Sequence, residues 1–148
     1  MISFFPDLNV WIALSVSGHS HSAEAWNWIS LLPGDARLVF SRYTQVGLLR
    51  LLTNQSVMGG QTLTLKSAWS VYERWLRDPR VEFYPEPRGL DVAFREATAP
   101  FDTKPASKWV GDCYLLAYAK QSDAALVTFD QALRAFARKR GCAAIVPA

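Results

Sequence analysis

Two aspartates in the sequence directly follow short apolar segments that predict buried β-strands. Asp7 comes after the strand expected over residues 2–5. Asp130 comes after a second strand, expected over residues 125–129. If both strands are central and parallel, the two carboxylates emerge at the same edge of the sheet. The alternative is that each aspartate caps a following helix, although Leu133 stands where a capping box would place Glu or Gln.

A third aspartate, Asp112, lies in a helix expected over residues 108–120. This segment is apolar nearly all the way round, so the helix should be buried, where an unpartnered carboxylate is costly. One interpretation is an i,i+4 ion pair with Lys108 on a narrow solvent-exposed face. The other is that Asp112 faces a polar site shared with Asp7 and Asp130.

Three carboxylates in one site repel one another, and a bound divalent cation removes that conflict. Oxygen ligands without His or Cys select a hard ion, so we expect Mg²⁺ or Mn²⁺. Such an ion activates water and stabilises the leaving oxygen in phosphodiester hydrolysis. His19 and His21 have no acidic or thiol ligand nearby in the sequence and are expected in an exposed loop.

The pattern of strands and helices predicts an α/β fold, with one domain over residues 1–148. We expect a central, mostly parallel sheet of four to five strands with helices on both faces. We also expect Asn54 to end a helix and residues 58–60 to form a loop. The remaining strands are expected at 37–41, 81–84 and 144–146, and the remaining helices at 8–14, 22–32, 44–52, 64–76, 90–97 and 131–138.

The composition is that of an ordinary globular protein and permits nucleic-acid binding without requiring it. The formal net charge is +3 and the pI is about 9.0. No apolar run approaches the roughly 20 residues needed to cross a bilayer, and the N-terminus lacks a signal-peptide pattern. We therefore expect a cytoplasmic protein with no membrane association. Cys113 and Cys142 form no CxxC pair and are expected to be buried thiols.

Four segments together resemble the PIN-domain nucleases, and in particular the VapC ribonuclease toxins of toxin–antitoxin pairs. The first is Pro-Asp-Leu-Asn-Val-Trp at residues 6–11, and the second runs from Arg to Asn over residues 42–54. The third is Trp-Val-Gly-Asp-Cys-Tyr-Leu at residues 109–115, and the fourth is Leu-Val-Thr-Phe-Asp at residues 126–130. Each segment is weak alone, but their order and spacing together are fairly specific.

The resemblance implies that Asp7, Asp112 and Asp130 are catalytic residues that bind or orient the metal. It implies that Asn9 and Thr128 are polar supports that hold these ligands in place.

In many PIN domains a fourth acidic residue, usually Glu, opens the helix after the second strand. We expect Gln45 at that position, as a member of the catalytic set that offers a neutral oxygen and no charge. The site should therefore bind metal more weakly than a site with four carboxylates.

The resemblance also implies partners. VapC-like toxins usually form homodimers and are inhibited by a VapB-like antitoxin, which lays a helix and an extended tail across the active-site groove. Trp11, Trp26 and Trp28 are candidates for lining that surface, and core packing is the alternative for each.

Several arginines are candidates for binding RNA phosphates, a role that suits guanidinium groups. For the basic cluster near the C-terminus, a solvated helix end is the competing interpretation. The candidates are Arg42, Arg50, Arg134 and Arg138.

The leading hypothesis is a toxin that is an endoribonuclease and cleaves tRNA or another structured RNA. The alternative is a catalytically weakened module of the same fold that binds RNA or protein without cleaving, which Gln45 would favour. A phosphoryl-accepting receiver domain is disfavoured. The tripeptides at residues 7–9 and 128–130 supply neither its acidic pair nor its lysine.

Overall fold

Short parallel strands alternate with helices along the part of the chain that the computed structural model describes, residues 2–148. The strand order in the single five-stranded sheet is β3-β2-β1-β4-β5, and every neighbouring pair is parallel. The elements are β1 (Ser3–Pro6), α1 (Leu8–Ser15), α2 (Ser22–Ser30), β2 (Arg37–Phe40), α3 (Arg42–Leu52), α4 (Gln55–Met58), the 3₁₀ helix η1 (Gly59–Gln61), α5 (Leu65–Leu76), β3 (Val81–Phe83), α6 (Leu90–Thr98), the 3₁₀ helix η2 (Ala99–Phe101), α7 (Ser107–Gln121), β4 (Ala125–Val127), α8 (Gln131–Lys139) and β5 (Ala144–Ile145).

The strand order reverses at β1. The chain first runs outward from β1 through β2 to β3, and it then returns to the other side of β1 to add β4 and β5. In parallel sheets, ligands bind beyond the carboxyl ends of the strands at such a reversal. The topology therefore marks the carboxyl ends of β1 and β4 as the place for a site.

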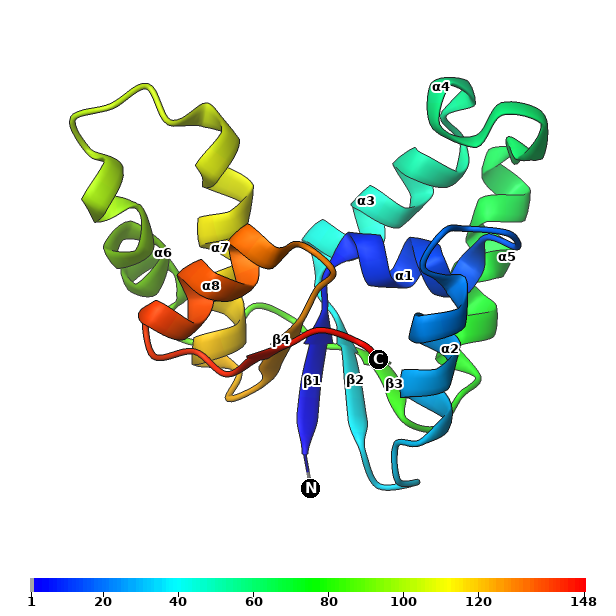
Figure 1. The fold of residues 1–148 in the computed structure, drawn as a ribbon, viewed down its shortest axis with the longest axis horizontal. Helices are drawn as coiled ribbons and strands as arrows, with labels where there is room; N and C mark the ends of the chain where they lie inside the picture. The colour runs from blue at the N-terminus through cyan, green and yellow to red at the C-terminus, as the bar shows by residue number, and fades with distance from the viewer. Residues whose placement is uncertain (1) are drawn as a thin grey trace.

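Helices cover both faces of the sheet, as the sequence predicts. Helices α1, α2, α3 and α5 lie on one side, and α6, α7 and α8 lie on the other (Figure 1). Beyond the carboxyl ends of the strands, α3 and α7 diverge from each other.

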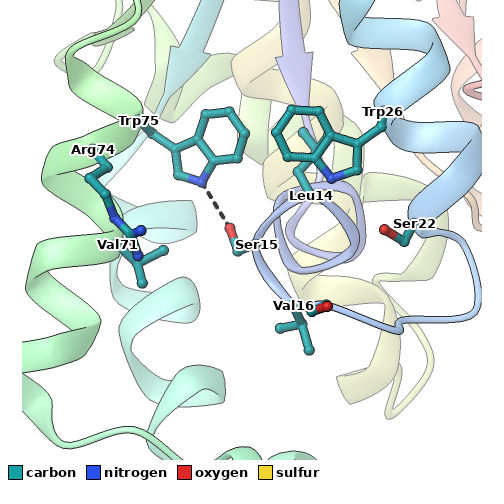
Figure 2. Close-up of a pocket in the computed structure, with 9 residues that line it drawn as sticks. Leu14, Ser15, Val16, Ser22, Trp26, Val71, Arg74 and Trp75 are labelled. Carbon is teal, nitrogen blue, oxygen red and sulfur yellow. Dashed lines mark hydrogen bonds between the residues drawn. The ribbon is translucent and has the colours of Figure 1, made fainter.

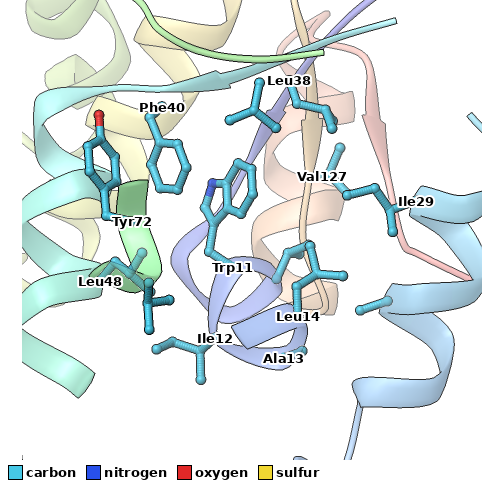
Figure 3. Close-up of a cluster of buried hydrophobic side chains, with 14 of the residues drawn as sticks. Trp11, Ile12, Ala13, Leu14, Ile29, Leu38, Phe40, Leu48, Tyr72 and Val127 are labelled. Atoms are coloured by element: carbon cyan, nitrogen blue, oxygen red, sulfur yellow. The ribbon is translucent and has the colours of Figure 1, made fainter. Parts of the chain in front are cut away.

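Alternating strand residues supply the two cores. Phe4 packs with the α1 side of the sheet, whereas its neighbour Phe5 packs with the α7 side. Trp11 lies at the centre of the larger core, fully buried, with its ring stacked on Phe40 at a centroid distance of 4.0 Å (Figure 3). Burial of this aromatic group anchors α1 on the sheet and fixes the position of the residues at its start.

The predicted strands and long helices are confirmed, with shifts of a few residues at their ends. Helix α3 starts at Arg42, two residues earlier than expected, because Ser41 and Thr44 form a capping box. Strand β4 ends at Val127, because the next residue turns toward the end of β1.

Two local predictions between α3 and α5 are wrong. Asn54 does not end a helix but caps α4, because its side-chain oxygen accepts hydrogen bonds from the amides of Ser56 and Val57. Residues 58–60 are not an irregular loop, since they complete α4 and begin η1. The buried face of α5 contains Ala68, Val71 and Tyr72.

Two expectations from composition can be compared with the structure. Cys113 and Cys142 are both buried free thiols, which confirms the prediction. None of the helices formed by residues 2–148 has the length and apolar character needed to cross a membrane.

Candidate active site

Asp7 and Asp130 lie beside each other because β1 and β4 are adjacent parallel strands. The register pairs Pro6 with Val127, and the Asp7 amide donates to the Val127 carbonyl at 2.8 Å. The next residue after Val127 is Thr128, whose hydroxyl accepts a hydrogen bond of 3.0 Å from the Asp130 amide. The two strand ends therefore deliver two carboxylates to one edge, as the sequence predicts.

A buried polar network fixes the orientation of Asp7. The Thr128 hydroxyl donates to Oδ2 of Asp7 at 2.9 Å, and the Asn9 amide donates to the same oxygen at 3.2 Å. Asn9 also donates to the Thr128 hydroxyl at 3.2 Å and accepts from the Phe129 amide at 3.2 Å. These bonds join α1 to the end of β4, and Thr128 is fully buried. Such contacts are what a supporting role for Asn9 and Thr128 requires.

Both aspartates at the strand ends also cap helices, so the two sequence interpretations are compatible. Oδ1 of Asp7 accepts from the Leu8 amide at 2.6 Å. Oδ1 of Asp130 accepts from the amides of Ala132 and Leu133, at 2.9 and 3.1 Å. Oδ2 of Asp130 receives no hydrogen bond from residues 2–148 and is available to a ligand. Asp7 therefore accepts hydrogen bonds at both oxygens, whereas Asp130 uses only one of its two.

Asp112 reaches the same region from α7. Its carboxylate forms neither a hydrogen bond nor an ion pair with any residue that the structure describes, so the alternative pairing with Lys108 is wrong. Burial raises the pKa of Asp112, and the negative charges of Asp130 and Asp7 add to this rise. Together they bring the pKa to about 6. The charges of Asp7 and Asp130 therefore reach the Asp112 carboxyl group.

The Asp7 carboxyl experiences the same conflict. Burial raises its pKa, and the charge of Asp130 adds to this rise, while hydrogen bonds from Thr128 and Leu8 act in the opposite direction. Within residues 2–148, no three acidic, His or Cys side chains are close enough to form a ready-made metal cage. The donor set nevertheless fits a hard cation, since such an ion keeps several waters and needs only one or two carboxylates in direct contact.

Gln45 does not join the acidic residues, contrary to expectation. Its side chain is buried, and its carbonyl oxygen accepts a hydrogen bond of 2.5 Å from the Arg42 guanidinium. The Tyr72 hydroxyl on α5 lies close to the same side chain. Because α3 turns by about 100° per residue, its face toward α1 contains position 47 rather than position 45. That residue is Gly47, which packs against Leu8.

Tyr43 is a residue near Asp112 that was not singled out from the sequence. Tyr43 is about half exposed on α3, and its ring packs edge-on against Tyr114 of α7 at 5.0 Å. A Cβ atom at position 111 would lie only 2.5 Å from the Tyr43 hydroxyl oxygen, so Gly111 is what permits this close approach. The signal was a glycine inside an otherwise apolar helix, which indicates close approach of another group.

His21 also lies closer to this region than its loop position indicated. Its ring stacks on Phe129, the residue before Asp130, with centroids 4.3 Å apart.

The candidate RNA-binding arginines differ in their surroundings. Arg42 is committed to protein contacts, with its guanidinium 4.5 Å above the Phe83 ring and bonded to Gln45. Arg50 is exposed and lines a hollow with Leu8, the neighbour of Asp7. Arg50 is therefore the candidate with the most direct access to the site.

The arginines of α8 lie farther along that helix. Arg134 is partly buried and Arg138 is exposed in the last turn. Arg138 stands about 12 Å along the helix axis from Asp130, at a rise of about 1.5 Å per residue. A basic residue in a last helical turn also interacts favourably with the helix dipole, which supports the solvated-end interpretation for Arg138.

Of the three tryptophans proposed to line a partner surface, two belong to the core. Trp11 is fully buried and Trp28 is 8% exposed, which confirms the core-packing alternative for both. Trp26 is 48% exposed and lines a groove with Trp75.

Comparison with known proteins now gives the class to which this fold and site belong. The family model of the PIN domain matches residues 4–139. Ribonuclease VapC41 of Mycobacterium tuberculosis is 38% identical over 130 residues, covering 85% of this chain and 88% of that protein. Ribonuclease VapC39 of the same organism is 31% identical over 127 residues, covering 86% of this chain and 88% of that protein. The chain belongs to the PIN-domain family and, within it, to the VapC ribonucleases.

Solved structures show the same fold at low sequence identity. One is VapBC2 from Rickettsia felis bound to a DNA fragment from its promoter, with a TM-score of 0.72, 14% identity and 98% coverage of both chains. Another is FitAcB from Neisseria gonorrhoeae, with a TM-score of 0.65, 19% identity and 97% coverage of both chains. These similarities confirm the predicted α/β architecture.

The raised pKa of Asp112 gives a pH-dependent stability. Because the folded state holds this proton more tightly than the unfolded chain, wild type loses stability as the pH rises from about 4 through the folded pKa of about 6. Asp112→Asn should therefore be more stable than wild type at pH 8, by about 1–2 kcal/mol after allowance for solvent screening. The difference should shrink toward pH 4. Urea unfolding in EDTA at pH 4, 6 and 8 measures it.

The matched control is Asp102→Asn, which removes the same charge at an exposed position. A stability gain for Asp112→Asn that is equal at all three pH values, or equal to that of the control, would contradict the assignment.

Proposed function

We propose that this chain is a metal-dependent endoribonuclease, the toxin component of a type II toxin–antitoxin system, which hydrolyses phosphodiester bonds in tRNA or another structured RNA. The observation that carries the proposal is the Asp112 carboxylate, which has no protein partner within residues 2–148 and senses the charges of Asp7 and Asp130. The names of the two relatives with 38% and 31% identity support the choice of RNA as substrate.

The proposed cofactor is Mg²⁺ or Mn²⁺, held by Asp7, Asp112 and Asp130. Carboxylate oxygens without nearby His or Cys ligands suit these hard ions. When bound, such an ion supplies activation of water and neutralisation of the charge that develops at the phosphate. With three carboxylates in place of four, we expect metal binding to be weak until RNA is present.

The protein's own residues orient the site. Thr128 and Asn9 hold Oδ2 of Asp7, and the amides at the start of α8 hold Oδ1 of Asp130. This support restricts both carboxylates before the substrate arrives, so little reorganisation is needed during the reaction. We assign Gln45 a positioning role, since it holds Arg42 against α3 and has no described contact with the acidic residues.

The arginines are proposed as phosphate contacts in the order of their access to the site. Arg50 comes first because it is exposed beside Leu8, and Arg134 and Arg138 would contact a longer RNA along α8. We further propose a cytoplasmic homodimer, on the family resemblance alone.

Cleavage of RNA by the purified protein tests the proposed activity. We expect wild type to cleave tRNA with Mn²⁺ or Mg²⁺ and to stop when EDTA is added. Asp112→Asn should reduce the rate at least about 100-fold, because it removes a charge that neutralises and orients the metal. Asp102→Asn, the exposed control, should retain wild-type activity.

Equal cleavage by wild type and Asp112→Asn would attribute the activity to a contaminating nuclease. RNA binding by wild type without cleavage at any metal concentration would favour the alternative, a weakened PIN-fold module. Either result would overturn the enzymatic proposal.

A groove at the far end of α1 from the acidic edge is the proposed binding site for the helix of a VapB-like antitoxin, whose extended tail would reach the acidic residues. Solved structures with this fold include VapBC assemblies, which supports such a partner. The groove has a volume of about 460 Å³ and lies between the end of α1, the start of α2 and α5. Figure 2 shows the rings of Trp26 and Trp75 beside each other at its wall, with the Trp75 indole bonded to Ser15 at 2.8 Å. The exposed indole of Trp26 beside the partly buried indole of Trp75 suits the apolar face of an amphipathic helix.

Trp26→Ala tests this placement. Removing an aromatic group from the centre of such an interface should weaken binding of the antitoxin at least about tenfold. The probe is the cognate VapB-like antitoxin, to be sought as a short reading frame for a small DNA-binding protein immediately upstream, and the measurement is calorimetry or co-purification. Trp69→Ala, which removes an exposed indole of α5 outside the groove, is the control. Wild-type binding by both variants would exclude the groove.

A further inference from the structure

A hollow lies between the start of α1 and the end of α3, and Leu8, the residue after Asp7, is part of its wall. Its volume is about 410 Å³. We propose that this hollow binds one nucleotide of the RNA strand adjacent to the phosphodiester that is cleaved. The inference rests on the proposed ribonuclease function and adds a substrate subsite to it. The hollow is lined by Leu8, Gly47, Arg50, Leu51, Thr53 and Asn54.

Leu8 links the hollow to the acidic residues. Leu8 forms part of its wall and is the residue after Asp7. The Leu8 amide is held by Oδ1 of Asp7 at 2.6 Å, so this wall cannot move independently of the carboxylate. A strand whose phosphate lies at the acidic residues therefore passes the hollow with its neighbouring nucleotide.

Gly47 lets Leu8 pack closely against α3 at the wall of the hollow. A glycine inside a helix costs about 1 kcal/mol relative to alanine, so its presence in the middle of α3 needs a reason. Its backbone does not need a positive φ. The reason lies in space, because an ideal Cβ at this position would be 2.6 Å from Cδ2 of Leu8. Any larger residue would displace Leu8 and fill the hollow.

The chemistry of the lining suits an anionic ligand with a flat apolar part. The side chains of Leu8 and Leu51 provide an apolar surface, and the lining contains no carboxylate. Arg50 is exposed and forms no ion pair with the described residues, so its guanidinium is free to bind a phosphate.

Asn54 supplies a second donor at the rim. Its Oδ1 is used to cap α4, with bonds of 2.9 and 3.3 Å, which leaves the amide nitrogen available. A cation, an amide donor and an apolar wall together match a nucleotide better than an acidic or purely apolar peptide segment.

Two variants test the subsite through different properties of the lining. Gly47→Leu fills the hollow, and Arg50→Gln removes the phosphate contact while leaving the space. We expect each to raise KM for a single-stranded 12-nucleotide RNA by about tenfold. For Arg50→Gln, kcat should stay within about twofold of wild type. Gly47→Leu also moves Leu8 beside Asp7, so this variant is judged by KM and by binding. Arg77→Gln, which removes an exposed arginine after α5, is the control and should leave KM unchanged.

Binding in the Asp112→Asn background separates affinity from chemistry. Fluorescence anisotropy with the labelled 12-nucleotide RNA should show the same tenfold loss for both subsite variants. Circular dichroism and thermal unfolding establish that Gly47→Leu is folded, and Arg50→Gln provides the test if it is not. Unchanged KM and affinity in Arg50→Gln, with wild type active, would overturn the subsite alone. Absence of both binding and cleavage in wild type would overturn the proposed function and the subsite with it.

Discussion

The parallel pairing of β1 with β4 is the constraint on which the candidate site depends. It places the end of β1 against the end of β4 although more than a hundred residues separate them in sequence, and Thr128 then reaches Asp7 at 2.9 Å. The network that follows is short and buried, so it leaves little freedom to the carboxylates. A one-residue change of register would reverse the direction of every side chain on β4 and separate Thr128 from Asp7.

Asp112 is the costly member of the set. The part of its helix that follows it is largely buried, and the carboxylate senses the charges of Asp7 and Asp130 without an ion-pair partner among residues 2–148. A protein that retains such a group sacrifices stability, and perturbed carboxyl groups of this kind concentrate at functional sites. Family membership gives the same interpretation independently, because VapC41 and VapC39 are named as ribonucleases.

Glycines shape both helices that diverge from the acidic edge. Gly47 lets Leu8 approach α3, and Gly111 lets the Tyr43 hydroxyl approach α7. On each helix the glycine admits a neighbouring side chain close to the candidate metal ligands. Two uncharged residues therefore determine how closely these neighbouring side chains pack against α3 and α7.

Sequence patterns predicted the strands, the order of the long helices and the three aspartates, because strand ends and an apolar helix are local signals. They failed where an answer depended on helix rotation or tertiary packing. Gln45 was assigned by its place near the start of a helix, yet α3 begins two residues earlier than expected and turns this side chain toward Arg42 and Tyr72. No local pattern reports which neighbour a helix will meet.

Calorimetric titration of the wild-type protein with Mn²⁺ is the most direct test of the shared acidic site. The account predicts that binding releases protons at pH 6, and releases fewer at pH 8, because the pKa of Asp112 is about 6 in the free protein. In Asp112→Asn, Mn²⁺ affinity should fall at least about tenfold and the extra proton release at pH 6 should disappear. Equal affinity and equal proton release in the two proteins would contradict the claim that the three carboxylates bind one cation together.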